Sequence, residues 1–87
     1  MAATKDDISG WFDRGVSEGA KFMLVICDTY DYDDYPMFFS NGKDCAEKFK
    51  KPGNMQSVME CYDLTADKDA QMRERRAMRL PPEATHD

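Results

Sequence analysis

The stretch that decides the fold is the apolar run at residues 22–27, Phe-Met-Leu-Val-Ile-Cys. It lies within residues 21–30, a segment rich in β-branched and aromatic side chains, which is typical of a β-strand. A strand with one solvent-exposed face alternates apolar and polar residues, and this run does not alternate. We therefore expect a strand whose middle is covered on both faces. The run is far shorter than the roughly 20 apolar residues that cross a bilayer, so no membrane span is predicted.

A turn and a second strand are predicted to follow this run. Residues 31–34, Asp-Tyr-Asp-Asp, are typical of a turn. Residues 36–40 have the composition of a short strand that starts with a proline, a position where a missing N–H is tolerated. Because an isolated two-stranded hairpin is only marginally stable in water, helices are expected to cover it.

The segment before the run predicts a helix over residues 5–18. Thr4 and Asp7 match a capping box, and Gly19 is a suitable residue to end the helix. Apolar or small residues recur at helical spacing on Ile8, Trp11, Phe12, Gly15 and Val16.

The remainder of the chain predicts two further helices. The first spans residues 44–51 and stops at Pro52-Gly53. The second spans residues 54–79, and a break at residues 63–65 would divide it into two. Its apolar or small residues recur at steps of three and four on Met55, Val58, Met59, Tyr62, Ala66 and Ala70.

These elements predict one α+β domain over residues 1–87, ordered at about residues 5–80, with frayed tails. The element order is α-β-β-α-α, with a two-stranded antiparallel hairpin covered by helices. Its exposed strand edges would permit a homodimer through sheet extension.

The chain of 87 residues has a net charge of −5, and all of this excess lies in residues 1–42. An acidic balance argues against direct nucleic-acid binding, which needs a basic surface. The N-terminus has no apolar region typical of a secretory signal, so a cytoplasmic protein is expected.

The three cysteines, Cys27, Cys45 and Cys61, form no closely spaced pair, which favours reduced thiols. A zinc site would require Cys45, Cys61 and His86 to converge with a fourth ligand that the sequence does not identify. We therefore predict no metal site and no cofactor.

The most unusual segment is residues 28–36, in which four acids and three tyrosines occur among nine residues. Tyrosines are favoured anchors of protein interfaces, and acids steer a basic partner toward them. A solvated hairpin end with tyrosines that pack across the strands is the alternative without a function. The predicted protein-binding residues are Tyr30, Asp31, Tyr32, Asp33, Asp34 and Tyr35.

Two chemical alternatives concern the same segment. Clustered carboxylates suit a hard cation, but a calcium loop counted from Asp31 needs Gly and Glu where Pro36 and Gly42 stand. A carboxylate pair that includes Asp28 would suit acid–base catalysis. Because no nucleophile motif or phosphate-binding loop accompanies it, no residue is assigned a catalytic role.

Four arginines, Arg73, Arg75, Arg76 and Arg79, crowd the end of the predicted long helix. They would complement the helix dipole and form ion pairs along the helix, for instance between Asp69 and Arg73. The functional alternative is a patch that binds an anion or a partner.

Three groups of residues resemble a family of small bacterial and tailed-phage proteins without an assigned activity. They are Trp11-Phe12-Asp13 with Gly15-Val16 and Gly19-Ala20, Cys27-Asp28-Thr29 with Asp34-Tyr35-Pro36, and Asn54-Met55-Gln56 with Val58-Met59-Glu60. The resemblance covers about residues 6–80. It implies a cytosolic setting and a phage or mobile-element origin, and it transfers no catalytic residue.

We therefore expect a non-enzymatic protein-binding module, such as a phage-encoded modulator or inhibitor of a host or defence protein. Two alternatives come from other classes. One is an acidic nucleic-acid mimic, and the other is a small metal-dependent or acid–base enzyme that uses Asp28 and neighbouring carboxylates.

Overall fold

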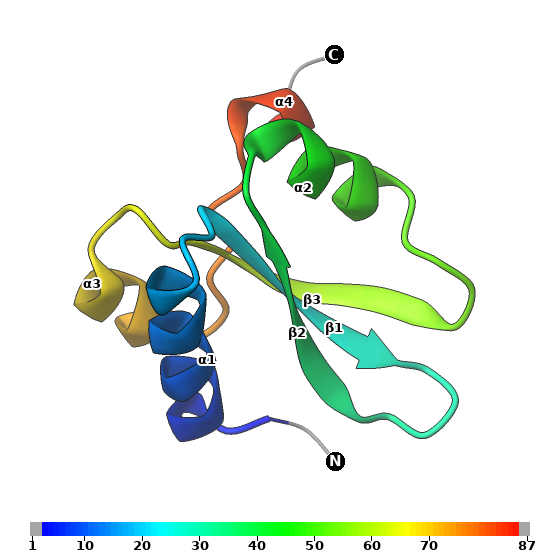
Figure 1. Ribbon diagram of the computed structural model, residues 1–87. Coiled ribbons are helices and arrows are strands. Elements are labelled where there is room, and N and C mark those ends of the chain that lie inside the picture. Colours follow the sequence, from blue (N-terminus) through cyan, green and yellow to red (C-terminus); the bar gives the residue numbers. More distant parts are fainter. Residues whose placement is uncertain (1–2, 86–87) are drawn as a thin grey trace.

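A computed structural model describes residues 3–85, which form a three-stranded sheet with helices on both faces (Figure 1). In chain order the elements are α1 (Lys5–Ser17), β1 (Phe22–Asp28), β2 (Asp34–Phe39), α2 (Gly42–Lys50), β3 (Gln56–Asp63), α3 (Lys68–Arg73) and α4 (Pro82–Thr85). The strand order is β2-β1-β3, and both pairs are antiparallel. The predicted α+β class is confirmed. No helix of the described part is long and apolar enough to cross a membrane.

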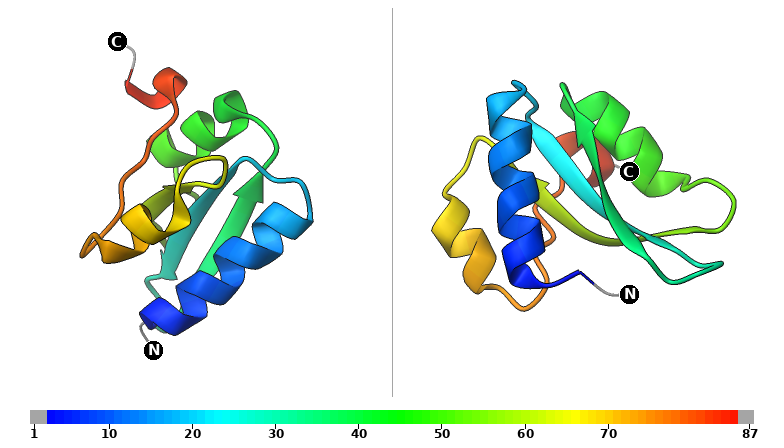
Figure 2. Two further views of the ribbon diagram at one scale, coloured as in Figure 1. Left: turned by 90° about the vertical axis from the view of Figure 1, so that its left-hand side faces the viewer. Right: turned by 60° about the horizontal axis from the view of Figure 1, so that its bottom comes forward.

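The apolar run is the central strand, and helices cover both of its faces, as expected. Met23 and Val25 pack against the side of the sheet that α1 covers, with Phe12. Leu24 and Ile26 pack on the opposite side, which α2 covers. Figure 2 shows α1 and α2 on opposite sides of the sheet. A strand buried on both faces has no position for a solvated side chain, which explains the missing alternation.

Helix α1 forms where the sequence predicts it. The hydroxyl of Thr4 accepts a hydrogen bond from the Asp7 backbone N–H, and the Asp7 carboxylate accepts one from Thr4 N–H, which completes the capping box. Gly15 packs so closely that a Cβ there would lie 2.7 Å from side-chain atoms of Phe38 and Leu64. Helix α1 therefore approaches the sheet at a distance that only glycine permits.

The predicted continuous helix over residues 54–79 is wrong, and so is the predicted two-stranded sheet. The alternative with a break at residues 63–65 is confirmed in part, because α3 follows that break. Residues 56–63 form a third strand, β3, which pairs with β1. Val25 pairs with Glu60 and Ile26 pairs with Val58, so Met59 is the extra residue of a β-bulge. The bulge interrupts the period-2 alternation of β3. The resulting steps of three and four imitate a helical stripe.

The residues after α3 form an extended segment along the outer edge of β3. Cys61 N–H donates to Ala77 O at 3.0 Å, and Arg79 N–H donates to Cys61 O at 2.9 Å. These bonds form a short parallel bridge between Cys61 and Met78. The segment carries the chain to α4, which packs against α2 (Figure 1). Residues 74–79 are therefore not helical, contrary to the prediction.

The outer edge of β2 carries a proline that faces away from the sheet. Asp28 N–H donates to Asp33 O at 2.8 Å, next to the β1–β2 ladder. In an antiparallel ladder every second residue pair exchanges backbone hydrogen bonds, so the next such pairs are Ile26 with Tyr35 and Leu24 with Met37. Tyr35 and Met37 therefore direct their backbone groups toward β1, whereas the backbone of Pro36 faces outward. The position of the proline costs the ladder no hydrogen bond.

Candidate functional site

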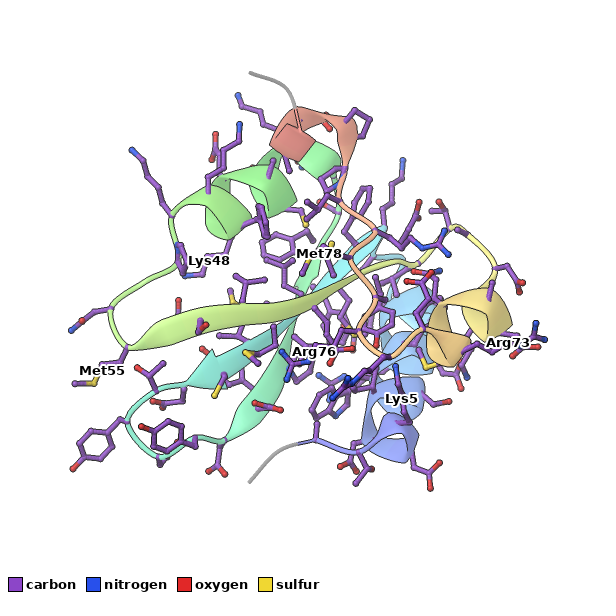
Figure 3. The ribbon with its side chains drawn as sticks, turned by 180° about the vertical axis from the view of Figure 1, so that it is seen from behind. Lys5, Lys48, Met55, Arg73, Arg76 and Met78 are labelled. Atoms are coloured by element: carbon purple, nitrogen blue, oxygen red, sulfur yellow. The ribbon has the colours of Figure 1, made fainter. Side chains whose placement is uncertain are left out.

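Two loops meet at one end of the sheet and expose large apolar side chains there. Thr29 N–H, between β1 and β2, donates to Met55 O, between α2 and β3, at 2.9 Å. Three side chains on these loops form what we call the exposed tip: Tyr30 is 77% exposed, Tyr32 68% and Met55 52%. Figure 3 shows the Met55 side chain pointing away from the sheet at this end. The tip therefore combines two neighbouring tyrosines with a methionine at least 23 positions further along the chain.

The loop between β1 and β2 is held by its own carboxylates. Tyr30 N–H donates to Asp28 Oδ1 at 2.9 Å, and Asp33 N–H donates to Asp31 Oδ1 at 3.2 Å. Asp28 O also accepts from Tyr32 N–H. Two acids of this segment thus stabilise the turn in the manner of Asx turns. Asp28, the residue suggested for acid–base chemistry, is engaged in this way.

The tip also contains two residues in an unusual backbone conformation. Tyr32 has φ of 61° and Met55 has φ of 57°, in the left-handed region. Residues with a Cβ pay about 1–2 kcal/mol for this conformation. The fold therefore accepts a cost at both positions that glycine would avoid.

Two of the predicted interface residues lie away from the tip. Tyr35 is half-buried on the α2 side of the sheet, and its hydroxyl accepts a hydrogen bond from Gln56 Nε2 at 2.7 Å. Asp34 accepts a hydrogen bond from Ala3 N–H at 3.0 Å. Tyr30, Asp31, Tyr32 and Asp33 all lie in the loop and are exposed.

The four arginines do not form one helical patch. Arg73 ends α3, and Arg79 donates hydrogen bonds to the Glu74 carboxylate. Arg75 and Arg76 line a pocket of about 510 Å³ on the side of the sheet that α1 covers. In the view of Figure 3, Arg73 lies beside α3, whereas Arg76 lies well apart from it.

This pocket, which we call the α1-side pocket, is built from five separate segments. They are residues 3–8, the end of β1, the loop before β2 with the first residue of β2, the bulge of β3 and the extended segment after α3. Among its lining residues are Lys5, Cys27, Met59, Glu60, Arg75 and Arg76. Burial and the neighbouring Asp34 raise the pKa of the Cys27 thiol above its ordinary value, which disfavours a thiolate nucleophile.

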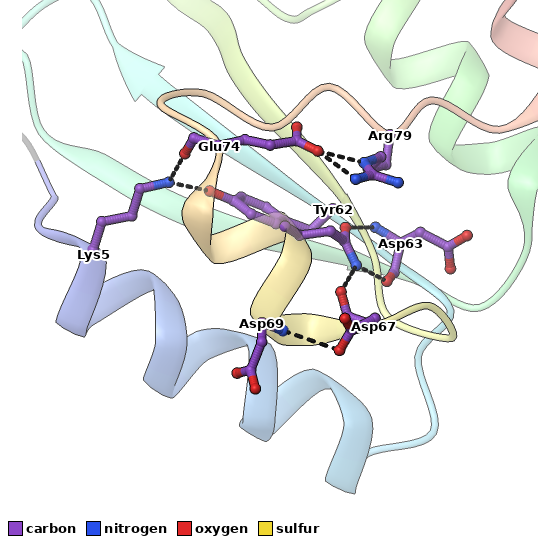
Figure 4. Close-up of polar contacts among 8 residues, drawn as sticks. Lys5, Tyr62, Asp63, Asp67, Asp69, Glu74 and Arg79 are labelled. Atoms are coloured by element: carbon purple, nitrogen blue, oxygen red, sulfur yellow. Dashed lines mark hydrogen bonds and ion pairs between the residues drawn. The ribbon is translucent and has the colours of Figure 1, made fainter.

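A polar network lies beneath the pocket. The buried Tyr62 hydroxyl donates to Glu60 Oε1 at 2.5 Å. Lys5 Nζ donates to Tyr62 Oη at 3.4 Å and to Glu74 O at 2.7 Å (Figure 4). Burial, and secondly the bond to Glu60, raise the pKa of Tyr62 well above its ordinary value. Sequence reasoning missed this network because it assigned residues 54–79 to a helix.

No group of three or more His, Cys, Asp and Glu side chains within the described part is placed to hold a metal ion. Cys45 and Cys61 are both free thiols buried in the core on the α2 side. A hydrogen bond with the Cys45 thiol, and secondly burial, raise the pKa of Cys61. His86, the third residue of the zinc alternative, lies outside the described residues.

The chain matches no protein-family model, no curated protein and no solved structure at a significant level. The resemblance to the bacterial and phage family therefore stays a prediction.

Proposed function

We propose that this protein is a non-enzymatic protein-binding module that contacts its partner through the exposed tip. The observation that carries the proposal is the gathering of Tyr30, Tyr32 and Met55 on two hydrogen-bonded loops. Tyrosine and methionine are enriched at protein interfaces, where they supply large apolar contacts. Methionine also adapts its shape to a partner.

The charges beside the tip indicate the kind of partner. Asp31 and Asp33 are exposed next to the tyrosines, and such acids accelerate encounter with a basic surface and set its orientation. The proposed partner is therefore a protein with a basic surface around an apolar recess. The resemblance stated above supports, as part of the proposal, a host or defence protein as the target of a phage-derived chain.

A photo-cross-linking experiment tests the tip directly. The photoreactive residue p-benzoylphenylalanine would replace Tyr30 in the full chain, and the matched control would carry it at Val16, an exposed apolar residue on α1. After irradiation in a lysate of the source cells, we expect a discrete adduct with the Tyr30 probe and none with the Val16 probe.

Competition and salt complete the test. Unlabelled wild-type protein should suppress the adduct, whereas protein carrying Tyr30→Ala and Met55→Ala should not. Raised salt should weaken the adduct, because exposed charges are screened. No adduct, or equal adducts from both probe positions, would refute the tip as the binding surface.

A further inference from the structure

The α1-side pocket carries positive charge in an acidic protein. Its charged lining residues are three cations, Lys5, Arg75 and Arg76, and two acids, Asp34 and Glu60. The chain as a whole has a net charge of −5. Clefts lined by an excess of one sign concentrate ligands of the opposite sign. The pocket therefore has one more cation than acid among its lining residues, a balance that favours an anion although the chain as a whole is acidic.

The two arginines have free guanidinium groups. Arg75 and Arg76 are exposed and form no hydrogen bond or ion pair with any described residue. Arg79, by contrast, is held by Glu74. Guanidinium groups bind carboxylate and phosphate oxygens through paired hydrogen bonds, so unengaged arginines at a pocket suit an oxyanion.

Glu60, by contrast, favours a hydrogen-bond donor on the ligand. This residue is 9% exposed, and it lines the pocket because the bulge at Met59 turns both side chains toward the α1 side. Its Oε1 accepts from the Tyr62 hydroxyl. No described residue donates to Oε2, and this oxygen is not sealed from solvent. A largely buried acceptor at a pocket favours a ligand that offers it an N–H donor.

The remaining lining is apolar or aromatic. Ile8 and Met59 contribute apolar surface, and Tyr32 also lines the pocket. A volume of about 510 Å³ suits a small organic molecule and is larger than a simple ion requires.

We propose that the α1-side pocket binds a small organic oxyanion that also carries an N–H donor, with the oxyanion on Arg75 and Arg76 and the donor on Glu60. This chemistry has two small-molecule sources, nucleoside monophosphates and free amino acids. The proposal does not depend on the protein partner proposed above.

Calorimetric titration of the purified full-length chain tests the proposal without any partner protein. One arm titrates the four nucleoside 5′-monophosphates against their nucleosides, which lack the phosphate. The other arm titrates amino acids against their amides, which lack the carboxylate. Inorganic phosphate and acetate, which lack the N–H donor, are titrated in both arms. We expect one class to bind at least about tenfold more tightly than both of its controls, and that class identifies the source.

Variants then assign the contacts. Arg75→Gln with Arg76→Gln should weaken the binding of that class at least about tenfold. Glu60→Gln keeps an acceptor for Tyr62 but presents an N–H where Oε2 stood, so it should weaken the same ligands. It should not weaken inorganic phosphate, because it removes a negative charge from the pocket. Arg73→Gln is the matched control, because Arg73 is an exposed arginine that does not line the pocket. Circular dichroism would establish that each variant is folded.

Three outcomes would overturn the proposal. The first is no binding of either class at millimolar concentration. The second is binding that the Arg73 and the Arg75/Arg76 variants reduce equally. The third is inorganic phosphate that binds as tightly as the organic ligands, which would indicate a nonspecific anion site only. None of these outcomes bears on the cross-linking test of the exposed tip, so the two proposals fail independently.

Discussion

The Tyr62 hydroxyl and the Glu60 carboxyl form a hydrogen bond along one strand, between residues that share the α1 side of β3. Both residues are buried, and the ring of Tyr62 packs edge-on against Phe12 at 6.4 Å between centroids. The pair thus links the core under α1 to the α1-side pocket.

Replacing Tyr62 by Phe should destabilise the protein by about 1–3 kcal/mol. The ring would keep its packing, but Oε1 of the buried Glu60 would lose its donor. Urea unfolding measures the change. Tyr35→Phe serves as the control, since the Tyr35 hydroxyl lies on a half-buried residue at the other side of the sheet, and it should cost less. Equal losses would contradict the assigned importance of the Glu60 bond.

Stability should fall as pH rises above about 10, the ordinary pKa of tyrosine. The pKa of Tyr62 is raised in the folded protein by burial and by Glu60, so the unfolded chain loses this proton at a lower pH than the folded one. Alkaline conditions therefore favour the unfolded state. Urea titrations between pH 8 and 11 should show a steeper decline for wild type than for Tyr62→Phe. Parallel declines would argue against the raised pKa.

Gln71 should be the most sensitive polar residue outside the pocket. Its fully buried side chain accepts from Asp63 N–H at 2.8 Å and donates to Asp63 O at 2.8 Å and Asp67 O at 3.1 Å. Gln71→Leu would leave the Asp63 N–H without its acceptor, whereas Asp63 O and Asp67 O would keep the backbone bonds that they accept from Ala66 and from residue 71. The expected cost is about 1–3 kcal/mol. Chemical denaturation of this variant, compared with Gln56→Leu at a half-buried position, checks the value. A loss no larger than that of Gln56→Leu would count against it.

Met55→Gly should stabilise the fold by about 0.5 kcal/mol. The backbone at φ of 57° suits glycine, and the Met55 side chain is exposed, so little packing is lost. The same change should weaken partner binding, because it removes one of the three tip side chains. Thermal unfolding and the cross-linking competition measure the two effects. Met78→Gly, at an exposed residue without positive φ, should destabilise the protein.

Pro36→Val should promote self-association. The outward-facing backbone at position 36 would gain an N–H, which completes the donors that a second strand can pair with on the free edge of β2. Analytical sedimentation at about 10–500 µM, a range that detects weak association, should show more dimer for Pro36→Val than for wild type. Pro52→Val, in the exposed loop after α2, should behave as wild type. Identical association of all three proteins would contradict the protective role of Pro36.

The sequence by itself determined the elements that depend on local interactions. The capping box of Thr4 and Asp7 joins residues three positions apart, and residues 22–27 identify the central strand from composition alone. The hairpin that exposes Tyr30 and Tyr32 follows from the turn at its end. In each case the deciding contacts lie within a few residues, so the pattern is visible in the chain.

Only the tertiary structure decided the third strand and the two candidate sites. Residues 56–63 pair with residues 28 or more positions earlier, and the bulge at Met59 makes their alternation resemble a helical stripe. Met55 joins the tip through a hydrogen bond with Thr29, and the α1-side pocket assembles from five segments. Such pairings depend on which strand edge and which faces are left uncovered once the chain collapses. That information belongs to the whole fold and is absent from any short window of sequence.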